Sequence, residues 1–431
     1  MAQPKSVPLT VAGSLAQSAG SGGSATSQAT LKSTANATVS ATAHATAKDA
    51  GALAKGASFR GAYFHVPFCR HKCHYCDFYS FVDTEDRALA YVQRLEEELQ
   101  DALEFLTVPI ETVFVGGGTP TMLGADLLAR MLASIRRTLP IATSAEWSVE
   151  ANPETVNEAV ADALAQSGVR RVSLGAQSFN PKLLKALERD HDPASVDRAV
   201  GLLRKAGIPQ VNLDLIFAIP GSTIADWEAD LLRALSIGPD HLSAYGLVYE
   251  PNTPLTVKLR KGSVTRLPED DEAEQYEFVV EKLAKSGYER YEISNWSLPS
   301  MACRHNILYW ENADWWAFGP SAAGHGNGVR WRNIPRLATW LENRPSAPVE
   351  EIECLGADAN AGESFMLGLR LMKGMPLERV ERLLKCGENA PRRRRSIETF
   401  TVDGLLEQVD GHLRLSARGF MIADTVLSAL I

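Results

Sequence analysis

The 431-residue sequence lacks two features that would place it in a class at once. No apolar run approaches the roughly 20 residues that a membrane-spanning helix needs, so we expect no transmembrane segment and at most a peripheral membrane association. Basic residues are not in excess, because the formal net charge is −8, and we therefore expect no nucleic-acid partner. The one basic run, Arg392 to Arg395, is interpreted as a solvated surface turn in an acidic chain.

Cysteine is also scarce, and its distribution does not indicate a disulfide framework. The chain has six cysteines, of which Cys303, Cys354 and Cys386 are scattered and are interpreted as ordinary thiols. This usage is typical of a reducing, intracellular environment and predicts a cytoplasmic location. Nothing in the sequence marks an oligomeric state, so monomer and dimer both remain open.

Residues 1–58 contain few large apolar side chains and no arginine. Such a segment of Ala, Ser, Thr and Gly cannot bury enough surface to offset its ordering entropy. It has no apolar core of the secretory type, and the absence of arginine weakens an organelle-targeting interpretation. We expect a disordered tail, or a start codon placed too far upstream, with ordered structure beginning near Phe59.

The most informative feature that is present is a cluster of three cysteines, Cys69, Cys73 and Cys76, in a C-x3-C-x2-C spacing. Three thiolates can hold three corners of a four-iron cluster and leave one iron open, whereas four thiolates are usual. A structural zinc site is the alternative, with His71 or His74 as a fourth ligand.

Short β-rich runs alternate with helical patterns over residues 59–250, and this order predicts parallel strands with right-handed crossovers. Since six such units fall short of the eight that close a barrel, we predict an α/β fold built as a partial (β/α)6 barrel. The expected strands are 62–67, 112–115, 146–150, 171–174, 210–217 and 241–248.

Polar and glycine residues follow these strands at the ends where barrel active sites lie. The cysteines follow the first strand and the glycine run 116–118 follows the second. Glu150 ends the third strand, Gln177 follows the fourth, and Asp214 lies within the fifth. Their common placement favours a site on one rim of the barrel.

The pattern changes to loops and helices after Pro251. We expect residues 251–350 to extend the barrel, with an edge strand and turn at 288–296. Residues 351–431 predict a small C-terminal α+β domain, resembling a winged helix, with a hairpin around Asp410-Gly411.

In these motifs the chain resembles the radical S-adenosylmethionine (SAM) superfamily, and within it the HemW-like heme chaperone branch of the oxygen-independent coproporphyrinogen oxidase family. The resemblance covers residues 61–431. It is carried by Tyr63-x-His65-x-Pro67-Phe68-Cys69, the three cysteines with Asp77-Phe78, Gly116-Gly-Gly-Thr-Pro120, Glu150-x-Asn152-Pro153-Glu154, Gly175-Ala-Gln177-Ser-Phe179, Asp214-Leu-Ile216 with Pro220-Gly221, and Arg304-His-Asn306-x-x-Tyr309-Trp310.

The resemblance implies a [4Fe–4S] cluster on the three cysteines, with SAM chelating the open iron. It implies that Glu150 accepts hydrogen bonds from the SAM ribose, as carboxylates do in other nucleotide sites, and that Tyr75 covers the adenine or shields the cluster. The glycine run is expected to let the backbone approach SAM closely. The other residues expected to contact SAM are Tyr63, Gly117, Gly118, Thr119, Gln177, Arg189 and Asp214.

Two positions separate the possible activities. Oxidases of this family carry a further cysteine two residues after the third, where this chain has Phe78. Its absence favours a heme chaperone, which binds heme and transfers it to acceptor hemoproteins, over oxidative decarboxylation of coproporphyrinogen III. The His305-Asn-x-x-Tyr-Trp motif is typical of the chaperone branch, and His305 is a candidate heme ligand. A radical SAM enzyme with another substrate is a third possibility, and whether SAM is cleaved stays open.

Overall fold

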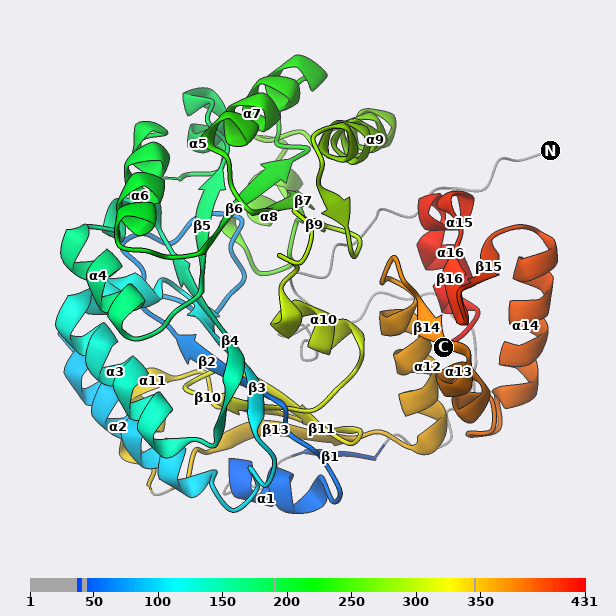
Figure 1. Ribbon diagram of the computed structural model, residues 1–431, viewed down its shortest axis with the longest axis horizontal. Helices are drawn as coiled ribbons and strands as arrows, with labels where there is room; N and C mark the ends of the chain where they lie inside the picture. Colours follow the sequence, from blue (N-terminus) through cyan, green and yellow to red (C-terminus); the bar gives the residue numbers. More distant parts are fainter. Residues whose placement is uncertain (1–36, 41–44, 190, 345) are drawn as a thin grey trace.

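One large curved sheet organises the molecule (Figure 1). The computed structural model describes residues 37–40, 45–189, 191–344 and 346–431. Within them, 13 strands form this sheet in the order β1-β13-β12-β11-β10-β2-β3-β4-β5-β6-β7-β9-β8. No helix in the described part of the chain is both long enough and apolar enough to cross a bilayer.

The six predicted parallel strands form the continuous centre of this sheet, β2 to β7, and this prediction is confirmed. Along these strands apolar residues that are fully buried alternate with residues that are mostly polar, and many of the polar ones line the cavities described below. The apolar set includes Val113, Val149, Val172, Leu213 and Leu242. The strands are β2 Gly61–Val66, β3 Ile110–Gly117, β4 Ile141–Ala151, β5 Arg171–Gln177, β6 Gln210–Phe217 and β7 His241–Gly246.

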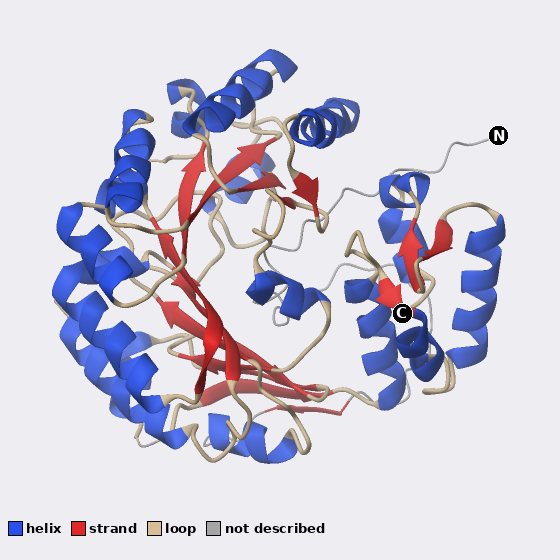
Figure 2. Ribbon diagram, viewed as in Figure 1, coloured by secondary structure: helices blue, strands red, loops and turns tan. Residues whose placement is uncertain are grey.

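Helices cover the convex face of the sheet and leave its concave face to the site (Figure 2). Helix α2 shows the local reason, because Tyr91, Leu95 and Leu99 recur at helical spacing and are fully buried or nearly so. The outer helices are α2 Ala88–Asp101, α3 Gly124–Thr138, α4 Glu158–Gln166, α5 Pro181–Ala186, α6 Ala194–Lys205 and α7 Ile224–Ile237, with short 3-10 turns η1 Pro120–Leu123 and η2 Pro153–Thr155.

The region after Pro251 contains more strands than the sequence analysis predicted, and that expectation is wrong in part. Strand β10 Trp315–Phe318 pairs in parallel with β2, so the parallel sheet has a seventh strand, donated from far along the chain. These strands are short and lack a repeating pattern, which is why they read as loops. The elements here are α8 Pro254–Arg260, α9 Glu269–Lys285, β8 Glu289–Arg290, β9 Asn295–Ser297, α10 Arg304–Trp310, β10, β11 Ala323–Gly326, β12 Val329–Asn333, α11 Leu337–Glu342 and β13 Val349–Cys354.

Ordered structure begins earlier than Phe59, so this part of the tail prediction is also wrong. Strand β1 Ala37–Ser40 pairs with β13, and helix α1 Ala47–Leu53 packs on the sheet. Small residues are what permit this contact, since a Cβ on Gly51 would lie 2.8 Å from the rings of Phe105 and Trp316. The remainder of the expected disordered tail, residues 1–36 and 41–44, lies outside the described residues.

The C-terminal domain has its own core and its own three-stranded sheet, β14-β16-β15, as the hairpin signal predicted. It begins with α12 rather than at residue 351, because β13 belongs to the large sheet. Its elements are α12 Ala357–Gly368, β14 Met375–Pro376, α13 Leu377–Leu383, α14 Ala390–Val402, β15 Leu406–Val409, β16 His412–Leu415, α15 Ala417–Met421 and α16 Ala423–Ser428.

The basic run is helical, so its interpretation as a solvated turn is wrong. Arg393 on α14 is fully buried, pairs with Asp358 at 2.9 Å and donates to the Leu430 carbonyl at 2.8 Å. It therefore ties α14 to α12 and to the end of the chain.

Candidate functional site

The three-cysteine loop is held against the end of β2 by its own backbone. The Cys69 N–H donates to the Phe81 carbonyl at 2.9 Å, and the Phe81 N–H donates to the Pro67 carbonyl at 3.0 Å. Inside the loop, the Lys72 ammonium donates to the carbonyls of Phe78 at 2.8 Å and Ser80 at 3.1 Å. These bonds fold the loop back on itself and give the cysteine side chains a fixed base.

The cysteine loop and the carboxyl ends of the parallel strands enclose one cavity of about 320 Å³, called here the rim cavity. Among the described residues, no three or more His, Cys, Asp or Glu side chains are grouped so that they could hold a metal ion as placed. The three cysteine side chains all line this one cavity. Of the predicted site residues, Cys69, Cys73, Cys76, Tyr75, Gly117, Gly118, Thr119, Glu150, Gln177, Arg189 and Asp214 line this cavity.

The glycine run joins the cysteine loop to the sheet. Gly118 N–H donates to the Val66 carbonyl at 2.8 Å, and Thr119 N–H donates to the Phe68 carbonyl at 2.7 Å. A Cβ on Gly118 would lie 2.7 Å from the same Val66 oxygen, and Gly117 has a φ of +104° with no room for a Cβ beside the His65 ring. Packing against β2 and the cysteine loop therefore already requires glycine here, and the N–H groups of Gly118 and Thr119 are bonded within the protein.

Glu150 stands at the end of β4 with its carboxylate over the glycine run. Its Oε2 accepts from the Gly117 N–H at 2.9 Å. Burial, followed by repulsion from the Asp214 carboxylate, raises the pKa of Glu150 to about 7. The carboxyl is thus poised to change charge near neutral pH and has capacity to accept hydrogen bonds from a bound hydroxyl.

Arg189 reaches from the segment after α5 to the cysteines. Its Nη1 donates to Cys73 Sγ at 3.5 Å and its Nη2 to the Gly175 carbonyl at 2.9 Å, while Nε faces His191 Nδ1 at 3.3 Å. Gly175 makes this possible, because a Cβ there would lie 2.7 Å from the Arg189 guanidinium. A cation fixed beside a thiol offsets the negative charge that a metal-bound thiolate carries.

Gln177 and Asp214 complete the floor of the rim cavity. Gln177 has a left-handed φ of +65°, which turns the chain sharply at the end of β5. Asp214 accepts from Ser173 Oγ at 2.8 Å and from Asn212 Nδ2 at 2.7 Å. These bonds hold the carboxylate in one orientation.

A second cavity of about 190 Å³, called here the inner chamber, lies on the other side of these residues toward the amino ends of the strands. It contains Tyr63, the one predicted SAM contact that does not line the rim cavity, and also His305. Helix α10 lies on the concave side of the sheet and forms part of its wall (Figure 1). The two cavities share the residues Phe78, Gly117, Glu150, Ser173, Asp214 and Tyr245.

His305 is buried on α10 with both ring nitrogens engaged. Nδ1 lies 2.8 Å from Thr112 Oγ1 and Nε2 lies 2.8 Å from the Tyr309 hydroxyl, while the ring stacks on Phe114 at a centroid distance of 5.3 Å. Burial lowers the pKa of His305 to about 3, so the imidazole is neutral. A neutral imidazole is the form that ligates iron, but a metal would have to displace Thr112 or Tyr309.

Glu146, which the sequence analysis did not select as a site residue, holds the start of helix α10 in place. Glu146 on β4 accepts from the Arg304 N–H at 2.9 Å and from the His305 N–H at 3.2 Å, and it also accepts from Cys303 Sγ at 3.4 Å. A carboxylate at these free amide groups stabilises the start of the helix. It fixes the HNxxYW motif inside the curve of the sheet.

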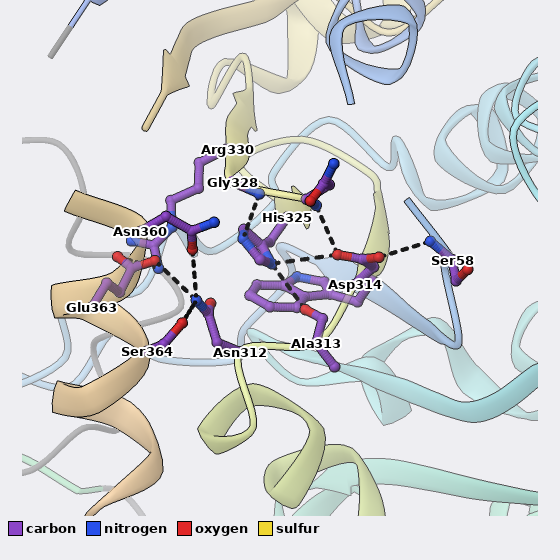
Figure 3. A network of polar contacts seen from close by, with 12 residues as sticks. Ser58, Asn312, Ala313, Asp314, His325, Gly328, Arg330, Asn360, Glu363 and Ser364 are labelled. Atoms are coloured by element: carbon purple, nitrogen blue, oxygen red, sulfur yellow. Dashed lines mark hydrogen bonds and ion pairs between the residues drawn. The ribbon is translucent and has the colours of Figure 1, made fainter. Parts of the chain in front are cut away.

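The C-terminal domain closes the inner chamber through α12, whose Met366 and Leu367 line it. Figure 3 shows the polar contacts that dock this helix: Asn312 Nδ2 faces Asn360 Oδ1 at 3.3 Å and Ser364 Oγ at 3.2 Å. Arg330, itself a chamber residue, pairs with Glu363 at 2.6 Å. We call these contacts the α12 latch. They hold α12 against the barrel, so that both the barrel and the C-terminal domain line the chamber.

Several chamber residues escaped the sequence analysis. Phe78 was selected only as the position of the absent cysteine, and Tyr245 lies within the sixth predicted strand; both border the two cavities. The signal for Arg171 was present, since a charged residue at a buried strand position is unusual, but a single sequence does not show which strand positions are buried. The remaining missed residues include Tyr291, Glu292, Asn295, Trp315 and Arg330, whereas Asn306, Tyr309 and Trp310 belong to the motif already singled out around His305.

A curved parallel sheet with three cysteines at its rim defines a radical SAM fold. In agreement, residues 63–234 match the model of the radical SAM superfamily, and residues 357–422 match that of the HemN C-terminal domain. Among solved structures, coproporphyrinogen III oxidase (HemN) from Escherichia coli superposes with a TM-score of 0.76 at 19% identity, covering 89% of this chain and 92% of that one.

Curated relatives narrow the class further. The chain is 38% identical over 377 residues to the heme chaperone HemW of Mycobacterium tuberculosis, covering 86% of this chain and 94% of that protein. It is 31% identical over 381 residues to the Escherichia coli heme chaperone HemW, covering 86% and 97%. The chain belongs to the HemW family of the radical SAM superfamily, as its motifs predicted.

Proposed function

We propose that this protein is a heme chaperone that carries a SAM-coordinated [4Fe–4S] cluster, binds heme and transfers it to acceptor hemoproteins. The observation that carries the proposal is the 38% identity to a curated heme chaperone over 94% of that protein's length. Because the ligand is a porphyrin, we place this role in porphyrin metabolism. The scarcity of cysteine supports a cytoplasmic location.

The rim cavity supports the cluster and SAM part of the proposal. Cys69, Cys73 and Cys76 would hold the cluster, whose open iron would chelate the amino and carboxylate groups of SAM. Two side chains of the cavity would assist. The Arg189 guanidinium, with Nη1 3.5 Å from Cys73 Sγ, would offset the negative charge of the thiolates, and the Glu150 carboxylate, which lines the same cavity, would accept hydrogen bonds. We propose that Glu150 holds the ribose hydroxyls of SAM.

The other predicted SAM contacts keep their assignments as part of this proposal. Gln177 and Asp214 form the floor of the cavity, and Tyr75 packs beside Leu183 and Leu187 at its edge. The N–H groups of the glycine run are already bonded within the protein. We therefore expect Gly117, Gly118 and Thr119 to contact SAM by van der Waals packing. Tyr63 would reach SAM only from the inner chamber.

For heme, we propose the inner chamber and His305. The chamber is lined by aromatic side chains, among them Phe114 and Tyr309, which suit the faces of a macrocycle. Coordination would use Nε2, the nitrogen engaged by Tyr309, because Tyr309 lines the chamber whereas Thr112, the partner of Nδ1, does not. Opening of the α12 latch would then widen the chamber enough to admit heme.

The experiment is anaerobic cluster reconstitution followed by heme titration and an assay for conversion of coproporphyrinogen III. We expect heme binding, transfer to an apo-hemoprotein and no protoporphyrinogen IX. Formation of protoporphyrinogen IX at a useful rate would establish the oxidase activity instead. Release of 5′-deoxyadenosine with another substrate would establish a different radical SAM reaction.

The same titration with His305→Ala tests the heme ligand. The expected result is a changed visible spectrum of the heme complex, since an axial ligand determines the iron's electronic state. An unchanged spectrum would remove His305 from the proposal. Cys386→Ala, in the C-terminal domain, is the control for a substitution outside both cavities.

A further inference from the structure

Arg171 is a buried cation without a partner. It is the first residue of β5, its side chain is 3% exposed, and it lines the inner chamber. Its Nε and Nη1 are buried and make no hydrogen bond, and no ion pair joins its guanidinium to any described residue. Buried charges in proteins are almost always paired, because leaving one unpaired costs several kcal/mol.

The acids nearest to Arg171 are committed elsewhere. Glu146 accepts from the start of α10, and Asp214 accepts from Ser173 and Asn212. Each of these carboxylates therefore acts on the Arg171 guanidinium through its electric field, but neither makes an ion pair or a hydrogen bond with it.

The other groups that face Arg171 are neutral in the folded protein. Burial raises the pKa of Cys303 to about 12, raises the pKa of Tyr291 and lowers the pKa of His241 far below neutrality. Burial also acts to lower the pKa of Arg171 itself, but the nearby acids, including Glu146 and Asp214, act in the opposite direction and the net shift is upward, so the guanidinium keeps its charge. The chamber thus holds one cation whose hydrogen bonds are unused.

Other unmatched polar groups of the chamber are also N–H donors. Trp310 Nε1 and Arg330 Nε are buried and without a partner, and both residues line the chamber. Ser294 Oγ, also unmatched, can donate or accept. By contrast, the chamber acid Glu292 accepts from Ser294 N–H at 2.9 Å and from Asn306 Nδ2 at 3.1 Å. The chamber therefore has hydrogen-bond donors without partners, and a ligand that supplies hydrogen-bond acceptors would satisfy them.

We propose that the inner chamber binds a carboxylate group and that Arg171 pairs with it. A planar guanidinium forms two parallel hydrogen bonds with a carboxylate, which is the acceptor that best matches its geometry. A ligand carboxylate would supply both the missing charge and the missing acceptors. Such a ligand must avoid Asp214 and Glu292, which confines its anionic end to the Arg171 side.

This carboxylate has two possible sources. One is a propionate arm of heme, since His305 lines the same chamber, and this case rests on the proposed function. The other is a small free carboxylate that occupies the chamber independently of heme. Both sources present the same carboxylate group to Arg171, so the test uses probes that distinguish a heme propionate from a free carboxylate.

The test compares the full-length wild-type protein with Arg171→Gln. Arg233→Gln is the matched control, because Arg233 is exposed and pairs with Asp197 on the outer surface. Three probes are titrated: iron protoporphyrin IX, its dimethyl ester, and succinate, the last followed by the shift in Tm.

If heme supplies the carboxylate, Arg171→Gln weakens binding of iron protoporphyrin IX by about 30-fold or more but leaves the dimethyl ester unchanged. If a free carboxylate is the ligand, succinate raises the Tm of wild type and of Arg233→Gln but not of Arg171→Gln. Identical behaviour of wild type and Arg171→Gln with all three probes would overturn the proposal. A wild-type protein that binds no heme refutes the proposed function, while the succinate comparison still decides the role of Arg171.

A stability measurement separates a binding role from a structural one. Because the unpaired charge costs free energy, Arg171→Met should leave the Tm of the ligand-free protein unchanged or raise it. A marked fall in Tm, together with unchanged carboxylate binding, would show that Arg171 serves the fold instead.

Discussion

The rim cavity and the inner chamber share a wall but are built in different ways. The rim cavity collects loops that follow successive parallel strands, and its buried cation Arg189 has partners in Cys73 and the Gly175 carbonyl. The inner chamber collects α10, β10 and α12 from the last third of the chain, and its cation Arg171 has no partner. This difference agrees with the two proposals made above, in which a cluster on the protein's own thiols completes the first cavity and a ligand brings an acceptor to the second.

The largest expected effect separates the two cavities by removing the cluster. Cys73→Ala takes one of three thiol ligands from the rim cavity, so we expect reconstituted iron and visible absorbance to fall to background. Heme binding in the inner chamber should persist. If heme affinity disappears together with the iron, the two cavities act as one site and the comparison fails. Cys386→Ala should retain its iron.

A carboxylate that belongs to both cavities provides the next test. Glu150→Gln preserves an acceptor for the Gly117 N–H but removes the negative charge, and we expect SAM affinity to fall about tenfold to a hundredfold. Isothermal titration of the reconstituted protein measures the loss. Glu158→Gln, which alters an exposed pair with Lys205, should bind SAM as wild type does. Equal SAM affinity in all three proteins would exclude Glu150 as a SAM contact.

The raised pKa of Glu150 adds a pH dependence with a defined sign. The folded pKa of about 7 lies above the usual 4.5, so between these values the folded state holds a proton that the unfolded state has lost. This group therefore makes the ligand-free protein less stable as pH rises from about 4.5 to 7. Chemical denaturation at several pH values measures this effect: between pH 4.5 and 7 the free energy of unfolding of Glu150→Gln should change less with pH than that of wild type. If the two proteins show the same pH dependence, the pKa of Glu150 is not raised.

The glycine run tests whether the rim depends on close backbone packing. Gly118→Ala places a Cβ 2.7 Å from the Val66 carbonyl, so we expect a loss of about 1–3 kcal/mol in stability and a lower cluster yield. Gly201→Ala is the control, since nothing lies within 4 Å of a Cβ there and α6 gains a better helix former. A Gly118→Ala protein as stable as wild type would show that the loop adapts.

The smallest effect concerns the α12 latch. Glu363→Gln removes the charge that pairs with Arg330 and should weaken docking of α12 by about 1 kcal/mol. Faster hydrogen exchange confined to residues 357–368 is the expected readout, with faster entry of heme into the chamber. Glu381→Gln, which breaks the exposed pair with Arg394, is the control. Unchanged exchange would show that apolar packing alone holds the helix.

The rim could be predicted in some detail because its residues follow the strands in order. In a parallel sheet all carboxyl ends meet at one edge, so Glu150, Gln177 and Asp214 converge once the strands are recognised. Tyr63 illustrates the limit: it lies on the first strand beside the cysteine motif, yet its side chain borders the other cavity. The N-terminal prediction failed because small residues, which we judged unable to form a core, let α1 pack on the sheet, with Gly51 against the rings of Phe105 and Trp316.

By itself, the sequence determined the order of the parallel strands, the cysteine loop and the family, since these depend on local patterns and fixed spacings. Only the tertiary structure decided that β10 joins β2, that Glu146 anchors α10, and that α12 closes a chamber around Arg171. The physical reason is that burial and pairing of a charge are set by segments far apart in the chain. In the sequence Arg171 looks like any other arginine, and the fold leaves it without a partner.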